Sequence, residues 1–236
     1  MPSAPVKVAV RAIADLDQRD WDEVVDFGSR FFEGAFADSI RAKRELVLLR
    51  GGDGRLVGMG AVEMFDATYA GRTVCVIHAG NAAFADEARG QGHVQRLGFR
   101  YFLRAKARRP WRPVYLAYTT FSWRSYLMLT RNFDRCWPSR REPLPAWEAG
   151  LYGRLGARLL GERYDPAAGL ARNLDRRLRP GIAAIPERLA GDLDLAYFCA
   201  ANPGYGSGDV LLCLAPLSLR NWWAVAREML RRRRRR

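Results

Sequence analysis

The sequence predicts one layered α/β domain, and three observations lead to this prediction. Segments rich in β-branched and aromatic residues alternate with segments whose apolar residues recur at helical spacing, in the order β-α-β-β-β-α-β-α over residues 6–133. A strand, a helix and a second strand occupy residues 72–120, which is typical of a crossover connection in a layered domain. The 236 residues are 49% hydrophobic, which is enough to bury a substantial core.

The elements follow in order from local patterns. Residues 6–13 read as a strand, and residues 15–36 as a helix with Asp17 or Asp20 as its N-cap. Residues 45–65 form the clearest hairpin, because two β-rich runs flank a Gly-Asp-Gly turn. The later elements are predicted as a strand at 72–84, a helix reaching about Lys106, a strand at 112–120 and a helix at 122–133.

The composition changes after Phe133, where Pro, Arg and Ala become frequent. We predict an insertion of helix and loops at residues 134–192, with one helix near 145–161. Strands are expected again at 193–205 and 209–218. The remaining residues, 219–236, form a basic amphipathic helix in which one face is predicted to carry Leu219, Trp222, Trp223, Ala226, Met229 and Leu230.

The charge and the cysteines limit the function classes. The net charge is +14, and the terminal run of arginines at residues 231–236 supplies a large part of it. Such a chain attracts nucleic acid, anionic lipid, phosphate-bearing cofactors or an acidic partner, and charge alone does not choose among them. The four cysteines (Cys75, Cys136, Cys199 and Cys213) are too far apart for a metal knuckle or a redox pair, so we expect no metal site and a reducing, cytoplasmic location. No apolar signal core and no run of about 18 apolar residues is present.

The glycine-rich loop before the second predicted helix is the strongest chemical signal. Gly90 and Gly92 follow a strand and precede a helix, where unsatisfied backbone N–H groups carry partial positive charge and can hold phosphate. The alternative is a glycine turn with no ligand. A Walker loop is excluded because no Gly-Lys-Ser/Thr follows, and the dinucleotide fingerprint lacks its third glycine.

This loop and the order of elements resemble the GNAT superfamily of acyl-CoA-dependent N-acyltransferases. The resemblance covers residues 6–133, and residues 193–218 would supply the last two strands. The family's loop motif is Gln/Arg-x-x-Gly-x-Gly/Ala, and the present sequence reads Arg89-x-x-Gly92-x-Val94. The resemblance implies a three-layer α/β/α fold whose central mixed, largely antiparallel sheet is splayed between its fourth and fifth strands.

The resemblance also implies which residues hold the acyl donor. Backbone amides of the loop would bind the pyrophosphate of acyl-CoA, and the end of the preceding strand would pair with the pantetheine arm. Val94 departs from the motif. This departure suggests an alternative donor, the phosphopantetheine of an acyl carrier protein. The implied cofactor-binding residues are Ala82, Ala83, Phe84, Arg89, Gly90, Gln91, Gly92, His93 and Val94.

Four residues are candidates for the proton chemistry. The resemblance places His78 at a general-base position of the family; the alternative is a half-buried structural histidine bonded to backbone. Glu63, on the neighbouring strand, is a candidate to bind a cationic acceptor, or else a solvated carboxylate. The family's tyrosine acid stands five residues before a phenylalanine, where this sequence has Met128, so Tyr126 and Tyr118 are the candidates for the acid.

The sequence therefore predicts an N-acyltransferase that moves an acetyl to fatty acyl group from a CoA or carrier-protein thioester to an amine. The alternative is a non-catalytic module of the same fold that acts at an anionic membrane surface or on nucleic acid. The insertion would roof an acyl tunnel or an acceptor cleft, or merely cover the sheet. The terminal helix has three interpretations: docking on an anionic membrane, docking on an acyl carrier protein, or a solvated tail.

Overall fold

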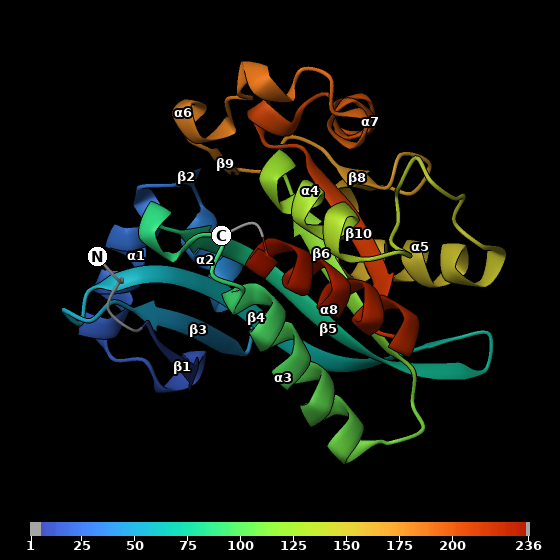
Figure 1. The fold of residues 1–236 in the computed structure, drawn as a ribbon, viewed down its shortest axis with the longest axis horizontal. Helices are drawn as coiled ribbons and strands as arrows, with labels where there is room; N and C mark the ends of the chain where they lie inside the picture. The colour runs from blue at the N-terminus through green and yellow to red at the C-terminus, as the bar shows by residue number, and fades with distance from the viewer. Residues whose placement is uncertain (1–5, 235–236) are drawn as a thin grey trace.

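The computed structural model describes residues 6–234, and the predicted mixed α/β fold is confirmed. An eight-stranded sheet lies at the centre, with helices on both of its faces (Figure 1). The strands are β1 (Lys7–Ala12), β2 (Phe32–Gly34), β3 (Glu45–Arg50), β4 (Leu56–Tyr69), β5 (Arg72–Phe84), β6 (Val114–Thr120), β7 (Tyr164–Asp165), β8 (Leu170–Ala171), β9 (Arg176–Leu178) and β10 (Val210–Pro216).

The helices follow the predicted order with additions. They are α1 (Gln18–Ser29), α2 (Phe36–Arg41), α3 (His93–Arg108), α4 (Trp123–Asn132), α5 (Ala146–Leu160), α6 (Pro180–Ala183), α7 (Leu193–Ala201) and α8 (Leu219–Arg234). The Asp17 side chain caps α1 by accepting from the Asp20 amide, as one of the two predicted caps. The predicted helix at 15–36 ends earlier, and β2 and α2 follow it.

The sheet order is β1-β3-β4-β5-β6-β10-β8-β7. Neighbouring strands are antiparallel except β5 and β6, which pair in parallel from Cys75↔Val114 to Ala79↔Tyr118. β5 continues to Phe84 and β6 to Thr120 without further pairing between them. These two strands are the fourth and fifth of the sheet order, so the predicted splay lies where it was expected.

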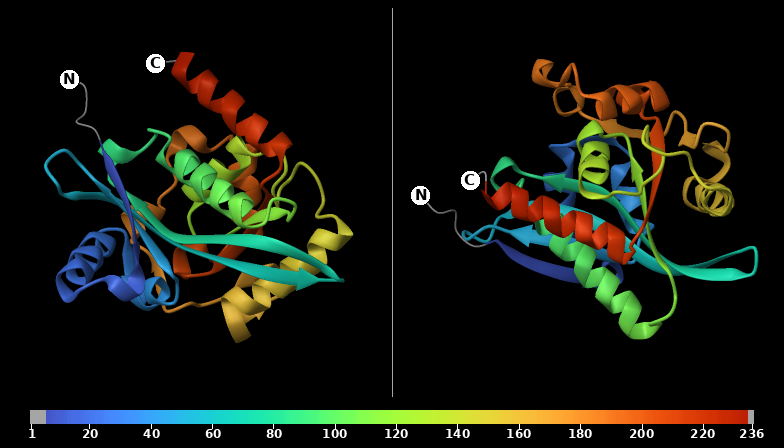
Figure 2. Two further views of the ribbon diagram at one scale, coloured as in Figure 1. Left: turned by 90° about the horizontal axis from the view of Figure 1, so that it is seen from below. Right: turned by 45° about the vertical axis from the view of Figure 1, so that its right-hand side comes forward.

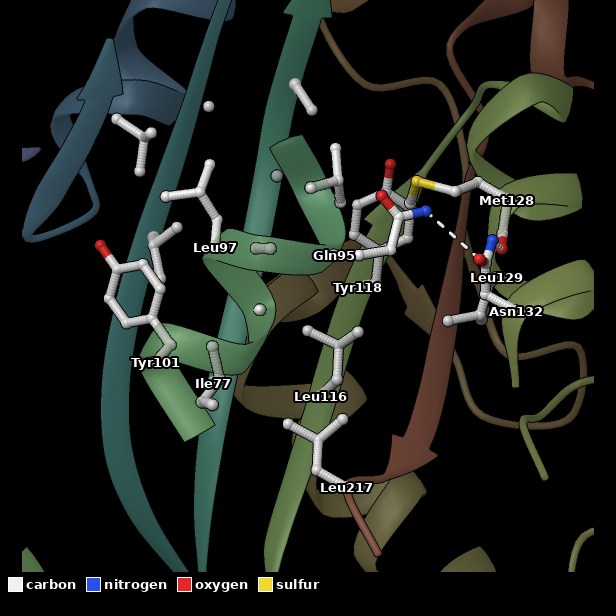
Figure 3. Close-up of a pocket in the computed structure, with 18 of the residues that line it drawn as sticks. Ile77, Gln95, Leu97, Tyr101, Leu116, Tyr118, Met128, Leu129, Asn132 and Leu217 are labelled. Carbon is white, nitrogen blue, oxygen red and sulfur yellow. Dashed lines mark hydrogen bonds between the residues drawn. The ribbon is translucent and has the colours of Figure 1, made fainter. Parts of the chain in front are cut away.

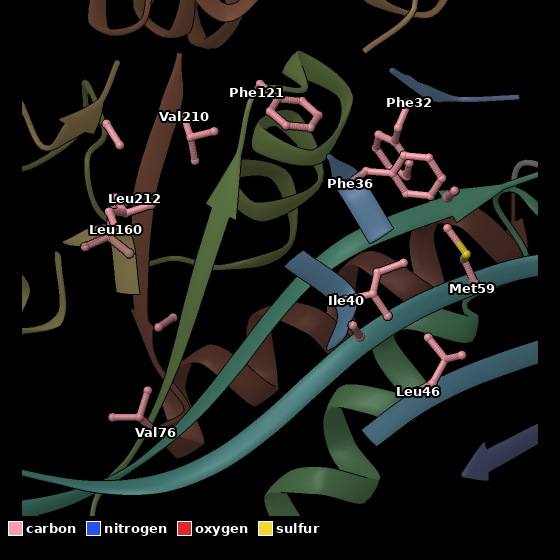
Figure 4. Packing of buried hydrophobic residues seen from close by; sticks show 14 of the residues in the cluster. Phe32, Phe36, Ile40, Leu46, Met59, Val76, Phe121, Leu160, Val210 and Leu212 are labelled. Atoms are coloured by element: carbon pink, nitrogen blue, oxygen red, sulfur yellow. The ribbon is translucent and has the colours of Figure 1, made fainter. Parts of the chain in front are cut away.

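Alternating side chains of the strands bury opposite faces of the sheet. One face carries a core that includes residues of α1, α2 and α5; Figure 4 shows Phe36 and Ile40 of α2 near Leu46 and Met59. The other face carries two apolar clusters that include residues of α3, α4, α7 and α8. Figure 2 shows α3 and α8 together on one side of the sheet, with α1 and α5 on the other.

Two predictions about the C-terminal third are wrong. Residues 193–205 contain helix α7 rather than a strand, because Asp192 caps it by accepting from the Leu195 amide and its apolar residues pack against α4. Apart from Asp194, residues 193–201 are apolar or aromatic, so their periodicity does not distinguish a buried helix from a strand. The sheet position beside β10 is instead taken by β8, which comes from the insertion.

The insertion is therefore more than helix and loops. Its β7 and β8 extend the main sheet, its β9 pairs with β2, and its helix α5 carries buried residues of the core. Trp137, which lies in the predicted insertion, is fully buried and forms a β-bridge with Leu214 of β10. None of the helices in the described residues has the length and the apolar character that crossing a membrane would require.

Candidate functional site

A cleft opens where β5 and β6 separate, with a volume of ≈ 330 Å³. Its walls come from the ends of both strands, the loop before α3, helix α4 and the insertion. It brings together every residue predicted to hold the cofactor, namely Ala82, Ala83, Phe84, Arg89, Gly90, Gln91, Gly92, His93 and Val94. The predicted residues, which span thirteen positions, thus form one continuous wall.

The start of α3 has left-handed glycines and no side-chain cap, as expected for a loop that binds an anion. Gly90 and Gly92 have φ angles of 71° and 76°, a left-handed conformation that favours glycine. Gly92 is the N-cap of α3, no side chain caps the helix there, and the first turn has no acidic residue. The first amides of a 16-residue helix therefore remain for an anion in the cleft.

His93, the first residue of α3, is buried. Its Nε2 lies 3.2 Å from Gln91 Oε1, and its Nδ1 lies 3.1 Å from an Arg96 nitrogen. Burial, followed by the charge of Arg96, lowers the pKa of His93. A neutral His93 therefore anchors the loop.

The end of β5 has an irregular backbone beside the cleft. Met59 pairs with Ala83 and Ala61 pairs with Gly80, so β5 holds one residue more than β4 over this interval. Asn81 lies in this bulge with a φ angle of 53°, and its side chain donates to Ser39 Oγ at 2.6 Å. Beyond Ala79 no pairing with β6 occurs within residues 6–234, so an extended ligand can add to this edge of β5.

Three side chains from three strands form a hydrogen-bonded chain that reaches the cleft. His78 Nδ1 lies 3.0 Å from Glu63 Oε1, and His78 Nε2 lies 3.3 Å from Thr119 Oγ1. Register explains the meeting: Glu63 is opposite His78 across the antiparallel pair β4–β5, and Thr119 points from β6 next to the point of splay. Only Thr119 of the three lines the cleft, because His78 is 3% exposed and lies behind it.

Electrostatics assign the protons in this chain. The hydrogen bond from His78 lowers the pKa of Glu63, which is therefore a carboxylate and accepts only. Burial lowers the pKa of His78 to about 4, so the imidazole is neutral near pH 7. With its proton on Nδ1, the His78 ring presents the lone pair of Nε2 to the Thr119 hydroxyl.

Two cations adjoin the chain. Lys43 Nζ lies 3.3 Å from His78 Nδ1, and burial lowers the pKa of Lys43 to about 8. Arg176, from β9 of the insertion, lines the cleft, and burial lowers its pKa as well. Both positive charges lower the pKa of His78, which keeps the imidazole unprotonated at rest.

The two candidate tyrosines are separated by the structure. Tyr118 lines the cleft, and burial raises its pKa to about 12, so it stays protonated near neutral pH. Tyr126 is fully buried in the core, donates to the Pro138 carbonyl at 3.0 Å and does not line the cleft. Met128, at the family's tyrosine position, does line the cleft beside Tyr118.

A second cavity of ≈ 130 Å³ adjoins the cleft on the α3 side of the sheet. Figure 3 shows it between Tyr118, Gln95 and Met128 at one end and Leu116 and Leu217 at the other. Apart from Gln95, Asn132 and the tyrosines, its lining consists of carbon-rich side chains and glycines. Both cavities are lined by Val94, Tyr118 and Met128 together with Ala79, Ala82, Phe84 and Gln95, and we call these shared residues the partition between them.

Sequence reasoning missed Lys43, Asn81, Thr119 and Arg176. Thr119 could have been predicted, because it follows the candidate Tyr118 directly in the predicted strand 112–120. Lys43 and Arg176 approach from segments outside the predicted strands, and only the packing of α2 and the insertion brings them to the site.

Solved structures that resemble this chain share its fold. No family model matches this sequence, and no curated protein matches it. Among solved structures, the chain is similar to a probable N-acyltransferase from Enterococcus faecalis, at 16% identity over 54% of this chain and 32% of that one, with a TM-score of 0.36. It is also similar to a GNAT family N-acetyltransferase from Escherichia coli in complex with CoA, at 14% identity over 51% and 66%, with a TM-score of 0.36.

A third similar structure is the N-myristoyltransferase of Saccharomyces cerevisiae with bound myristoyl-CoA, at 10% identity over 50% of this chain and 32% of that one, with a TM-score of 0.35. This chain thus spans about a third of the length of the first and third of these proteins.

Proposed function

We propose that the protein transfers an acyl group from a phosphopantetheine thioester, of coenzyme A or of a carrier protein, to an amine. One observation carries the proposal: an uncapped helix start, an unpaired strand edge and a hydrogen-bonded Glu63–His78–Thr119 chain with a buried His78 converge on the same cleft. The first suits phosphate, the second suits the amide-bearing pantetheine arm, and the third suits proton removal from an amine.

The donor would lie along the wall formed by the loop and the end of β5. Its phosphate would accept from the amides at the start of α3, and its pantetheine would pair beside Ala82 and Phe84. The thioester would then lie near the end of the β5–β6 pairing, next to Thr119. A carrier protein presents one phosphate to this loop and coenzyme A presents two in its pyrophosphate, so the loop accepts either chemistry.

The proton chemistry follows from the assigned protons. As the amine attacks the thioester carbon and forms the C–N bond, its proton passes to Thr119, whose hydroxyl proton passes to His78 Nε2. Glu63 stabilises the resulting imidazolium through Nδ1. The C–S bond breaks, and the thiolate takes a proton from Tyr118, the one of the two candidate tyrosines that reaches the cleft. Exchange with solvent then returns a proton to Tyr118 and removes one from His78, which restores both residues.

The apolar cavity would receive the acyl chain of the donor. Its ≈ 130 Å³ are comparable with cavities of about 150 Å³ that bind benzene, so about four to six carbons fit. Butyryl to hexanoyl chains would fill it, and an acetyl group would leave it empty. Val94, the departure from the family motif, lies on the partition, where a branched side chain contacts the acyl chain.

The acceptor side of the cleft is positively charged. Arg176 and Arg124 line it, together with the apolar Ile182 and Leu178 of the insertion. Glu63 is already bonded to His78, so it is poorly placed to bind a cationic acceptor as well. The arrangement favours an amine that also carries an anionic group, such as an amino acid or a peptide end.

The binding of coenzyme A to the full chain tests the proposal. Isothermal titration should detect it, and the melting temperature should rise with its concentration. Gly92→Ala should weaken the affinity about tenfold, because a Cβ is strained at this φ angle and displaces the helix start. Gly71→Ala is the matched control, since Gly71 has a φ angle of 74° in an open hairpin turn away from the cleft.

Each result has a defined meaning. Loss of affinity in Gly92→Ala but not in Gly71→Ala places the phosphate at the loop. No binding of coenzyme A, pantetheine phosphate or any thioester would leave only the alternative of a non-catalytic module and would end the enzyme proposal.

A further inference from the structure

Helices α3 and α8 lie side by side, and together they form one outer surface of the molecule (Figures 1 and 2). The Trp222 ring of α8 packs between Phe99 and Phe102 of α3, with centroid distances of 5.0 and 5.3 Å. The buried side of α8 also carries Ala224 and Val225. These contacts hold α8 to the domain, and the opposite side of the helix faces solvent.

The predicted apolar face of α8 is thus divided by the structure. Trp222 is turned inward, while Leu219, Trp223 and Leu230 are 85%, 72% and 58% exposed. They are four and seven residues apart, which places them on one side of the helix over about 16 Å. A soluble helix normally buries such a stripe.

Helix α3 continues this apolar surface. Phe99 and Leu103, one turn apart, are exposed beside α8, and Trp111 in the loop after α3 is 96% exposed. Exposed apolar residues are ordinary when they are scattered singly, but a group on two adjacent helices marks an interaction site.

Arginines surround this apolar surface. Exposed arginines stand on both helices, namely Arg96, Arg100, Arg104 and Arg108 on α3 and Arg220, Arg227 and Arg231 on α8. Three of them also pair with carboxylates, Arg104 with Glu45 and both Arg220 and Arg227 with Asp134. The terminal arginines 235–236 lie outside the described residues. We call the exposed apolar residues and these arginines together the α3–α8 face.

We propose that the α3–α8 face docks on an anionic lipid bilayer. Leucine and tryptophan side chains enter the boundary between headgroups and acyl chains, while arginines at the same level contact the lipid phosphates. A second copy of the chain is disfavoured because it would oppose arginines with arginines. Nucleic acid has no apolar interior that exposed leucines could enter. An anionic bilayer can bind both the apolar residues and the arginines of the α3–α8 face.

Vesicle co-sedimentation with the full chain tests the proposal. The chain should bind vesicles of phosphatidylcholine mixed with phosphatidylglycerol, and should bind phosphatidylcholine alone at least about tenfold more weakly. The double variant Trp223→Ser/Leu230→Ser should lose about tenfold or more in affinity, from the apolar area no longer buried. Leu193→Ser is the matched control, because Leu193 on α7 is 64% exposed away from this face.

A charge variant supplies a second measurement. Arg108→Gln/Arg231→Gln should weaken binding to the anionic vesicles by about fivefold per arginine, and added salt should remove that difference. These two positions are exposed, and the double serine variant changes two exposed residues, so all variants should keep the wild-type melting temperature and affinity for coenzyme A.

Four results would overturn the inference. One is equal binding to neutral and anionic vesicles; another is unchanged binding of Trp223→Ser/Leu230→Ser; the third is a concentration-dependent dimer that depends on Trp223. Binding of polyglutamate as tight as that of vesicles, with no dependence on Trp223, would also replace the bilayer by a charge-only surface. The inference does not depend on the proposed acyl transfer.

Discussion

The cleft and the apolar cavity lie on opposite sides of one partition, yet their linings differ in chemistry. The cleft contains helix amides, arginines and the Thr119 hydroxyl, so it can recognise charge and direction. The cavity behind Val94, Tyr118 and Met128 is lined almost wholly by carbon and can recognise only size and shape. The comparison predicts that changes in the cleft affect every donor alike, whereas changes in the cavity affect only donors with longer acyl chains.

The largest effect is expected from the proton path in the cleft. Thr119→Val and His78→Gln should each lower kcat by 10²- to 10⁴-fold, the usual contribution of general acid–base catalysis, and by the same factor for acetyl and hexanoyl donors. Steady-state kinetics with a saturating amine measures this. Thr73→Val is the control, since the Thr73 hydroxyl contacts Thr68 in the β4–β5 hairpin away from the cleft. Full activity of Thr119→Val would remove Thr119 from the path.

The second effect is a loss of folding stability at acidic pH, which we expect from His78 behind the cleft and not from the cavity. The pKa of His78 is about 4 in the folded chain against its usual value of 6.5. Below pH 6.5 the unfolded chain binds a proton that folded His78 rejects, so stability present above pH 6.5 is lost as the pH falls toward 4. The loss attributable to His78 is at most about 3 kcal/mol.

Urea unfolding between pH 4 and pH 7 checks this expectation. His78→Gln should show a shallower loss of stability with falling pH than the wild type. A cavity variant, Gly98→Leu, should keep the wild-type slope. Equal slopes in His78→Gln and the wild type would contradict the assigned pKa.

The smaller effect concerns the cavity itself. Gly98 of α3 lines it, and a Cβ there meets only the Trp222 ring at 3.9 Å, so Gly98→Leu can enter the space without disturbing the backbone. Each buried methylene of an acyl chain contributes about fourfold in affinity. Wild type should therefore bind hexanoyl-CoA at least about tenfold more tightly than acetyl-CoA, and Gly98→Leu should lose this preference.

Gly153→Leu on α5 is the matched control, because a Cβ at Gly153 meets nothing within 4 Å and the helix gains the same propensity. Leu116→Ala should shift the preference toward octanoyl-CoA by enlarging the cavity. An unchanged chain-length profile in both cavity variants would show that the acyl chain lies elsewhere, while leaving the cleft as the donor site.

Much of the core could be predicted because its signals are local. Residues 72–84 form β5 with the predicted bounds, since a β-branched run between turn residues has few alternatives. The glycine loop could be assigned to a helix start because its glycines directly precede the helix in the sequence. The structure shows both glycines in the left-handed conformation and no side-chain cap on the helix. The nine residues predicted to hold the cofactor are also close together in the sequence, which is why all of them line one cleft.

What the sequence by itself determined is therefore the layered α/β core, the crossover around residues 72–120 and the loop at its centre. Only the tertiary structure decided that residues 193–201 form a helix, that α8 turns Trp222 inward and Trp223 outward, and that Lys43, Glu63, His78 and Thr119 meet. The physical reason is that periodicity records which residues are apolar, whereas contacts between distant segments decide which of them find a partner. The partition at Val94 and Tyr118 exists only because three such segments converge on the splayed strands.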